Sequence, residues 1–272
     1  MLTSFFAVNP AGTRMDFPLS SLQTGYIVQK VEGLDPVKAS FTTTTLAGAS
    51  GLYYRSGSRD SRNVVITMEL RGDLVGETNG KLRTRLYEIF SPGRKVTFGI
   101  VVDGVYFGTL YARTETFEAD MFTRKPLVNI SLLCFDPDIL GPSTTTPTLA
   151  THNVTERIIN YAGTEPTGWV LTTEPMPDAR TGVSIYLSNS DRSSMINFGG
   201  ALNAGDILKI STVRGNKFIR RVRAGAEISV LSSVSTDSTW AMLDPGENRI
   251  RVTTPNTWFG YKIQYMPRYG GI

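Results

Sequence analysis

The sequence predicts a mainly β protein with one helix, divided into two domains. Charged residues make up only 19% of the 272 residues, and Gly, Ser and Thr are frequent. This composition is typical of β-rich proteins with many turns and little exposed helix. A single domain usually contains about 100 to 200 residues, so we expect this chain to bury two separate cores.

A polar segment marks the expected boundary between the two domains. Apolar residues at positions 127–135 predict a strand that is covered on both faces and closes the first core. Asp136 and Pro137 stop this strand, and the Ser-Thr-Thr-Thr-Pro run that follows Gly141 and Pro142 offers little to bury. We therefore expect a first domain at 1–142, a linker at 143–152 and a second domain at 153–272.

One segment of the first domain has helical periodicity. We expect the helix to begin at Asn79, which can cap its first turn, and to end before the Pro-Gly pair at 92–93. The spacing of its apolar residues gives it one buried face. That face consists of Leu82, Leu86, Ile89 and Phe90.

Strands account for most of the remaining first domain. Asp103 and Gly104 tolerate the positive φ angles of a two-residue turn, so they predict a hairpin. Residues 40–46 are β-branched and polar on both faces. By contrast, the Gly, Ser, Tyr and Arg residues at 47–60 predict a long exposed loop or arm, which is often a site of contact with another molecule. Strands are expected at 26–31, 63–70, 95–102, 105–111, in the 110s and at 127–135.

The second domain contains short apolar segments separated by turn residues, which is typical of a β-sandwich. In the segment 249–253, alternation places Ile250 and Val252 on one face and Arg249 and Arg251 on the other. The strands are expected at 154–160, 169–173, 183–187, 195–198, 207–213, 218–222, 228–231, 249–253 and 261–265.

Charge and hydropathy exclude two classes of partner. The net charge is +4; residues 1–142 carry 15 basic and 14 acidic side chains, and residues 143–272 carry 13 and 10, so the excess is +1 and then +3. Nucleic-acid recognition requires a denser basic patch. No apolar run approaches the roughly 18 residues of a membrane span, and the N-terminus does not resemble a signal peptide, so we expect no membrane insertion.

The residues available for chemistry predict no catalytic, cofactor or metal site. Cys134 is the sole cysteine and His152 the sole histidine, which excludes an intrachain disulfide, a cysteine-rich metal site and, in practice, a histidine-based triad. Asp136 and Asp138 are read as turn residues rather than calcium ligands. No pair of carboxylates is singled out for glycoside hydrolysis. The Gly-rich segment 76–81 lacks the spacing and the Ser or Thr of a phosphate-binding loop.

Two sets of residues are candidates for binding a ligand or a partner. The three tryptophans can form a sugar-stacking platform or pack in the core. The arginines of segment 218–223 can meet an acidic partner or protect a solvated edge strand. The candidates are Trp169, Trp240, Trp258, Arg220, Arg221 and Arg223.

A series of short motifs resembles the distal tail protein family of siphophages. In the first domain the motifs are Gly33-Leu34-Asp35-Pro36, Arg62 before a strand ending at Gly72, a helix ending at Pro92, and the segment 130–137. In the second they are the segments 160–167 (NYAGTEPT), 205–210 (GDILKI), 243–250 (LDPGENRI) and 265–269 (YMPRY). Each motif is short, and the resemblance rests on their order along nearly the whole chain.

This resemblance implies a structural protein and not an enzyme. It implies a first domain with a β-sandwich or split-barrel-like fold that forms a homohexameric ring, and a galectin-like jelly-roll sandwich as the second domain. The ring would lie at the virion tail tip, after synthesis in the host cytoplasm, and contact the major tail tube protein, a tail-associated hub or fibre protein and the tape measure protein. As a hypothesis, its contacts include Leu46, Leu52, Tyr53, Tyr54, Asp103 and Gly104. The alternative function is a lectin-like protein that binds a host cell-surface saccharide.

Overall fold

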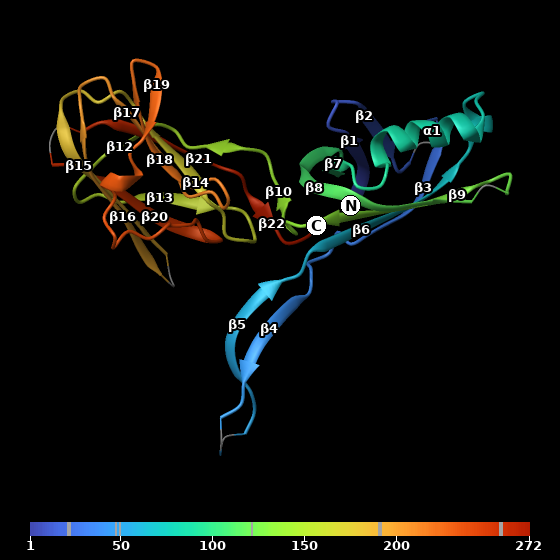
Figure 1. Cartoon of the computed structure of the whole chain (residues 1–272), viewed down its shortest axis with the longest axis horizontal. Helices are drawn as coiled ribbons and strands as arrows, with labels where there is room; N and C mark the ends of the chain where they lie inside the picture. Colours follow the sequence, from blue (N-terminus) through green and yellow to red (C-terminus); the bar gives the residue numbers. More distant parts are fainter. Residues whose placement is uncertain (21–22, 47, 49, 121, 190–191, 256–257) are drawn as a thin grey trace. The chain divides into compact units, whose positions relative to one another are not determined.

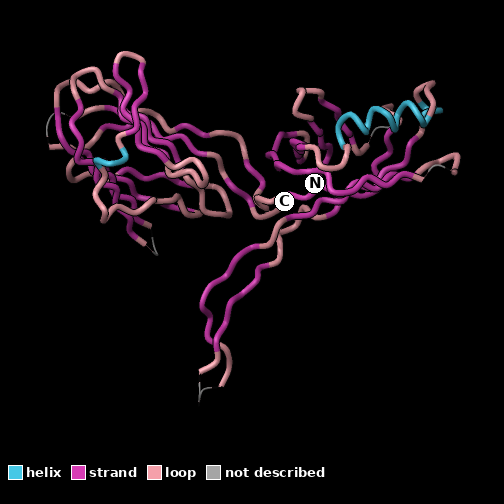
Figure 2. Tube along the Cα trace, in the orientation of Figure 1, coloured by secondary structure: helices cyan, strands magenta, loops and turns pink. Residues whose placement is uncertain are grey.

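The chain forms two compact units that are built mainly from β-strands (Figures 1 and 2). The computed structural model describes residues 1–272 except 21–22, 47, 49, 121, 190–191 and 256–257. The first unit contains residues 1–141 and 269–272, and the second contains residues 142–268. One α-helix is present among the described residues, so the predicted fold class, mainly β with one helix, is confirmed.

One antiparallel sheet organises the first unit, in the strand order β2-β1-β7-β8-β9-β6-β3, with the short strands β10 and β22 at its side. Sequence analysis missed its first two strands. The bounds are β1 Leu2–Val8, β2 Arg14–Pro18, β3 Tyr26–Glu32, β6 Arg62–Leu70, β7 Lys95–Val102, β8 Val105–Ala119, β9 Leu127–Cys134, β10 Ile139–Leu140 and β22 Arg268–Tyr269.

The turn between β7 and β8 agrees with its prediction. Asp103 and Gly104 have φ angles of 50° and 79°, and such a pair of positive values matches the twist of the flanking strands. Because β8 continues to Ala119, the segment in the 110s belongs to this strand and is not a separate one.

Strand β9 lies between β8 and β6 and is buried on one face, not on two as the sequence indicated. Its residues alternate, with Val128, Ile130 and Leu132 fully buried. Leu127 is 40% exposed and Phe135, just after the strand, is 68% exposed. The face of β9 opposite the core is therefore open in this chain.

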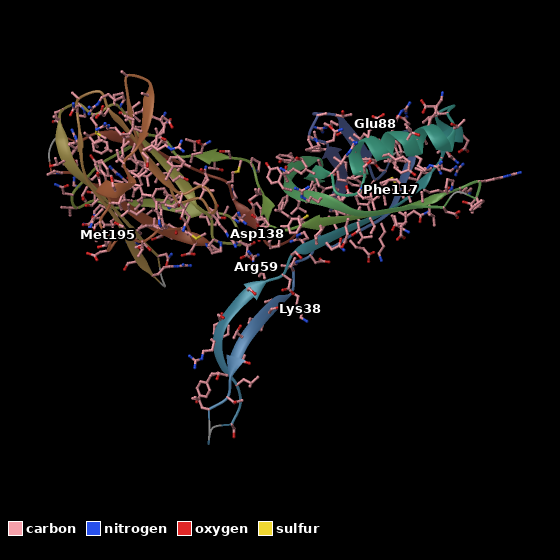
Figure 3. All side chains as sticks on the ribbon, in the orientation of Figure 1. Lys38, Arg59, Glu88, Phe117, Asp138 and Met195 are labelled. Atoms are coloured by element: carbon pink, nitrogen blue, oxygen red, sulfur yellow. The ribbon has the colours of Figure 1, made fainter. Side chains whose placement is uncertain are left out.

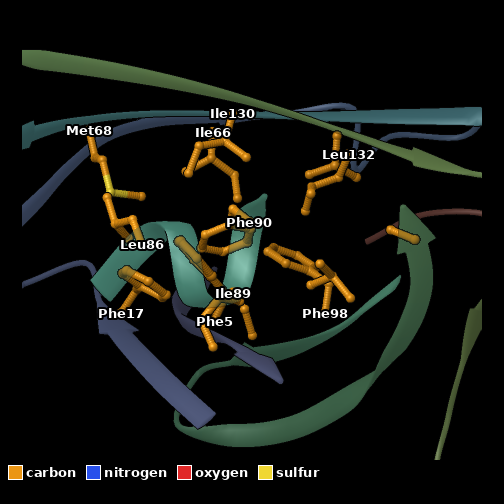
Figure 4. Packing of buried hydrophobic residues seen from close by; sticks show 14 of the residues in the cluster. Phe5, Phe17, Ile66, Met68, Leu86, Ile89, Phe90, Phe98, Ile130 and Leu132 are labelled. Carbon is orange, nitrogen blue, oxygen red and sulfur yellow. The ribbon is translucent and has the colours of Figure 1, made fainter. Parts of the chain in front are cut away.

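Helix α1 (Asn79–Phe90) covers the core face of the sheet, and it buries all four residues that the sequence predicted. Figure 4 shows Leu86, Ile89 and Phe90 among the apolar side chains of the sheet. The cap differs from the prediction, because the Thr78 hydroxyl accepts the bond from the Lys81 backbone N–H. The Asn79 carboxamide instead accepts a 2.7 Å hydrogen bond from the Gly72 backbone N–H. A short 3-10 helix, η1, precedes this region at Gly72–Leu74.

The last four residues pack with the first unit, although sequence analysis assigned them to the second domain. The Tyr269 ring lies 4.7 Å from the Phe107 ring. The Ile272 backbone N–H donates a 3.2 Å hydrogen bond to the Leu34 carbonyl. These contacts join the C-terminal residues to residues more than 150 positions earlier in the chain. Such contacts leave no periodic pattern in the sequence, so the assignment of residues 269–272 to the second domain was wrong.

The second unit is a sandwich of two antiparallel sheets, in the orders β11-β21-β14-β17-β18-β19, with β12 also on β21, and β13-β20-β15-β16. Its core combines Leu171 and Ile263 of the first sheet with Ile185 and Ile250 of the other. A 3-10 helix, η2, lies at Leu231–Ser233. The strands are β11 Thr144–Thr145, β12 Leu149–Ala150, β13 Arg157–Tyr161, β14 Trp169–Thr173, β15 Arg180–Ser188, β16 Ser193–Leu202, β17 Ile207–Ser211, β18 Phe218–Arg223, β19 Ala226–Ser229, β20 Gly246–Thr253 and β21 Gly260–Tyr265.

The predicted linker at 143–152 is part of this sandwich. Both β11 and β12 pair with β21. Thr146 shows why the polar run is ordered: its backbone N–H donates to the Ile263 carbonyl at 2.9 Å, and its hydroxyl accepts from the Ile263 N–H at 3.1 Å. A threonine-rich segment can thus join a sheet edge without apolar burial. No helix among the described residues has the length and hydropathy to cross a membrane.

Candidate assembly interface

The predicted arm is a β-hairpin rather than a loop. Strands β4 (Ala39–Thr44) and β5 (Tyr53–Arg59) form a two-stranded sheet of their own, and every residue of β5 is exposed. Figure 1 shows this hairpin leaving the sheet of the first unit between β3 and β6. An isolated two-stranded hairpin is marginally stable in water, so this segment is suited to packing against another molecule.

The arm exposes large apolar side chains. Phe41, Leu52 and Tyr54 are 64%, 68% and 67% exposed. The Phe41 and Tyr54 rings meet edge to face with centroids 6.0 Å apart. A cluster of exposed apolar groups on one surface typically marks an interaction site. Leu46, Tyr53 and the other predicted contacts on the arm are also exposed; sequence analysis missed Phe41, which stands alone in a polar run.

Two contacts hold the root of the arm: an ion pair to the first unit, and a backbone hydrogen bond that closes the base of the hairpin. The Arg59 guanidinium lies 2.6 Å from Oδ1 of Asp138, whose side chain is only 3% exposed. The Asp60 backbone N–H donates to the Lys38 carbonyl at 3.1 Å. Figure 3 shows Lys38, Arg59 and Asp138 near one another at the root. Asp138, which the sequence suggested only as a turn residue, therefore anchors the hairpin.

Arg62, three residues beyond the arm, is buried to 1% exposure and bonds four backbone carbonyls. Burial lowers the pKa of its guanidinium, but arginine remains charged in proteins. A planar fork of five donors can serve several acceptors at once. Its partners are the carbonyls of Pro137 (2.6 Å), Gly33 (2.6 Å), Asp35 (2.8 Å) and Gly270 (2.5 Å).

Replacing Gly33, whose carbonyl is bonded by Arg62, with alanine is expected to destabilise the first unit strongly. The φ angle of Gly33 is +82°, and a Cβ atom there would lie 1.8 Å from the Asn63 carbonyl oxygen. We expect Gly33→Ala to lower the free energy of unfolding of the first unit by about 3 kcal/mol, from backbone strain and from displacement of Asn63. Denaturant titration measures this value. Gly12→Ala is the matched control, because Gly12 has φ +86° and no atom within 4 Å; equal losses in the two variants would contradict the steric argument.

Two further features of the first unit are available for contacts. Asp103 and Gly104, the other predicted ring contacts, lie at the β7–β8 turn, where Oδ1 of Asp103 accepts from the Met1 ammonium at 2.7 Å. The edge strands β2 and β3 each pair on one side only within the described sheet. An edge strand presents unpaired backbone groups that can pair with a second chain.

The three tryptophans do not form one sugar-stacking platform, which corrects the interpretation of them as a set. Trp169 is fully buried because the alternation of β14 directs it into the sandwich core. Trp240 packs partly against that core, with the Lys217 ammonium 5.6 Å from its ring. Only Trp258 is largely exposed, at 53%, and its ring lies 4.5 Å from that of His152.

The arginines of β18 have partners within the second unit. Arg223 donates two hydrogen bonds to Asp206, at 2.8 and 2.7 Å, and this interaction holds the pKa of the Asp206 carboxyl below its usual value. Arg220 pairs with Glu227 at 3.2 Å, and Arg221 makes a long, 3.5 Å contact with the Ala201 carbonyl. The strand therefore presents less net positive charge than its sequence suggests.

The other chemical candidates are structural. Cys134 is buried, and desolvation raises the pKa of its thiol to about 12, which disfavours the reactive thiolate. The sequence Arg71-Gly72-Asp73 matches an adhesion tripeptide, but Arg71 donates to both carboxylate oxygens of Asp73, at 2.9 and 2.8 Å, so the two side chains pair with each other. Within the ranges that the structure describes, no group of three His, Cys, Asp or Glu residues could hold a metal ion.

Comparisons with known proteins identify a related family and fold. Residues 162–269 match the model of the siphovirus-type tail component, C-terminal domain. The fold is similar to that of the SPP1 Dit protein, a paradigm of the hub adsorption apparatus in Gram-positive infecting phages, with a TM-score of 0.70, 16% identity and coverage of 97% of this chain and 98% of that one. A protein of the phage P2 baseplate matches at 10% identity over 97% and 98% of the two chains, with a TM-score of 0.48. The search of curated proteins gave no match.

Proposed function

We propose that this chain forms a homohexameric ring at the tip of a phage tail. Its match to the siphovirus-type tail component model over residues 162–269 and its similarity in fold to the SPP1 Dit protein support this role. The ring joins the major tail tube protein to a tail-associated hub or fibre protein, close to the tape measure protein. It acts as a structural connector without catalysis, and it is synthesised in the host cytoplasm before assembly into the virion.

The observation that carries this proposal is that the arm combines a fixed root with exposed apolar side chains along its length. The root is held by the ion pair between Arg59 and Asp138 and by the four hydrogen bonds of Arg62. The two strands of the arm and the end of the turn between them expose Phe41, Tyr54 and Leu52. A hairpin held in this way can bury its apolar side chains on a neighbouring copy without a large loss of conformational entropy.

A closed ring also requires two different contact surfaces on each subunit. The arm supplies one surface, and the open edges β2 and β3 of the first sheet supply backbone groups for pairing with a neighbour. The β7–β8 turn, with Asp103 and Gly104 and the adjacent Val105 at 70% exposure, is a further contact in this proposal. These surfaces belong to different elements, as head-to-tail association demands.

Immunogold electron microscopy of phage particles that carry this protein tests its place in the virion. Antibodies against the purified chain should label the end of the tail that is distant from the capsid. Labelling along the tail tube, labelling of the capsid, or particles without label would contradict the proposal. Antibodies against the major tail tube protein provide the control for access to the tail.

A further inference from the structure

A depression of about 390 Å³ lies on the second unit, at one end of the sheet that contains β12, β14 and β21. Three segments line it, and backbone hydrogen bonds hold them together. Ala150 of β12 pairs with Gly260 of β21, and the Glu174 backbone N–H, just after β14, donates to the Gly260 carbonyl at 2.7 Å. The fold therefore sets the shape of the depression. Its lining includes Leu149, Glu174, Pro175, Pro177, Trp258 and Gly260.

The wall of the depression contains an exposed indole ring. Trp258 is 53% exposed, and its ring lies 4.5 Å from the ring of His152. The Nδ1 atom of His152 in turn accepts hydrogen bonds from the backbone N–H groups of Val154 and Thr155, at 3.1 and 2.8 Å. The indole is thus supported by a neighbour that is itself held in place. The exposed face of such a ring attracts cations.

Glu174 is the only charged side chain among the described residues that line the depression. Its carboxylate lies directly against the backbone of Gly260, where a Cβ atom would be 2.3 Å from Oε2. A larger residue at position 260 would therefore displace the carboxylate. No described lysine or arginine, Lys262 on the same strand included, makes an ion pair with Glu174, whereas Glu247 of the same unit pairs with Arg249 at 2.8 Å. The negative charge of Glu174 is available to a cation from another molecule.

The combination of a carboxylate with an indole ring matches an arginine side chain. A guanidinium is planar, so two of its N–H groups can bond one carboxylate while its face stacks on an aromatic ring. The methylene groups of the same side chain can pack on Pro175 and Pro177, which are both exposed in the depression. The ammonium group of lysine is not planar and is more strongly hydrated, so lysine fits this site less well.

We propose that this depression binds an arginine side chain presented by another tail protein. The guanidinium pairs with Glu174 and stacks on Trp258, and the methylene groups lie against the two prolines. The choice of occupant rests on the proposed function: the proposed ring contacts all belong to the first unit, so a site in the second unit remains open for a protein other than this chain.

Saturation-transfer NMR with short peptides tests the site in the full chain, whether the chain is a monomer or a ring. The probe is an acetylated and amidated Gly-Arg-Gly peptide. One control peptide replaces its arginine with citrulline, which has nearly the same shape without the charge, and a second replaces it with lysine. We expect the arginine peptide to bind at least about tenfold more tightly than the citrulline peptide, and more tightly than the lysine peptide. Equal binding of either control, no binding of the arginine peptide, or its displacement by maltohexaose would overturn the proposal.

Variants then place the binding in the depression. Glu174→Gln and Trp258→Leu should each weaken binding of the arginine peptide at least about tenfold. Gly260→Ala keeps the carboxylate but displaces it, so this variant should weaken binding as well. Glu156→Gln, the matched control, removes an exposed carboxylate of the same unit outside the depression and should bind like the parent. Circular dichroism and thermal midpoints establish that each variant is folded, and unchanged affinity in folded Glu174→Gln would refute the site.

Sedimentation velocity separates this site from the contacts of the ring. Glu174→Gln should self-associate like the parent protein, because the site takes part in no contact between copies of the chain. Weaker self-association of Glu174→Gln would place a second copy in the depression and would contradict the assignment to another protein. A parent protein that binds the arginine peptide but stays monomeric would support the site and contradict only the ring.

Discussion

Replacing Phe41, Leu52 and Tyr54 together with serine is expected to abolish self-association of this protein and leave its fold intact. These side chains are exposed in the single chain, so the substitutions remove no core contact. If they are buried on a neighbouring copy, the loss of two aromatic rings and one leucine weakens each contact about 100-fold or more, which corresponds to about 2.7 kcal/mol. Sedimentation velocity over a range of concentrations measures the shift from assembled protein to monomer.

Phe122→Ser is the matched control for the arm variant. Phe122 is fully exposed and lies in the first unit, outside the arm. Its replacement removes an exposed aromatic ring from the same unit and should leave association unchanged. An arm variant that assembles as readily as the parent protein would show that the hairpin does not hold the ring together.

Replacing Arg62 with alanine is expected to produce the largest loss of stability from a single substitution. The variant leaves four carbonyl oxygens without their charged donor and opens a cavity at a site of 1% exposure. We expect the free energy of unfolding of the first unit to fall by about 4 kcal/mol, since several charge-assisted hydrogen bonds are lost together. Differential scanning calorimetry and denaturant titration measure this change.

Arg62→Lys separates the effect of charge from that of geometry. Lysine keeps the positive charge but lacks the planar fork, so it should recover only part of the lost stability. Arg55→Ala, at an exposed position of β5, should change the free energy of unfolding by no more than about 0.5 kcal/mol. A loss below about 1 kcal/mol in Arg62→Ala would contradict the role of Arg62 as the anchor of the arm root.

Local patterns predicted the elements whose causes are local. The apolar spacing of α1 and the positive φ angles that Asp103 and Gly104 tolerate are both set by neighbouring residues, and both predictions are confirmed. The strand predicted at 169–173 is also confirmed as β14, but the sequence could not say which of its faces, and therefore whether Trp169, is buried. The buried face is set by the second sheet of the sandwich, whose residues Ile185 and Ile250 share the core with Trp169 and Leu171.

The sequence predicted where the candidate interface lies along the chain, but not its secondary structure or the contacts that hold it. The aperiodic residues 47–60 indicated an exposed arm, yet the pairing of β5 with β4 depends on the cross-strand register. The role of Arg62 could not be predicted, because its partners are backbone carbonyls as far as 208 positions away, and a carbonyl group has no sequence signature. The packing of residues 269–272 with the first unit could not be predicted either, because it also depends on contacts between residues far apart in the sequence.

The mass of the purified protein in solution, measured by light scattering together with negative-stain images, tests the central proposal most directly. A ring of six copies with an open centre, formed by the chain alone or with its tail neighbours, is the result that we predict. A protein that remains monomeric under both conditions would contradict the proposal that it works by assembling into a ring.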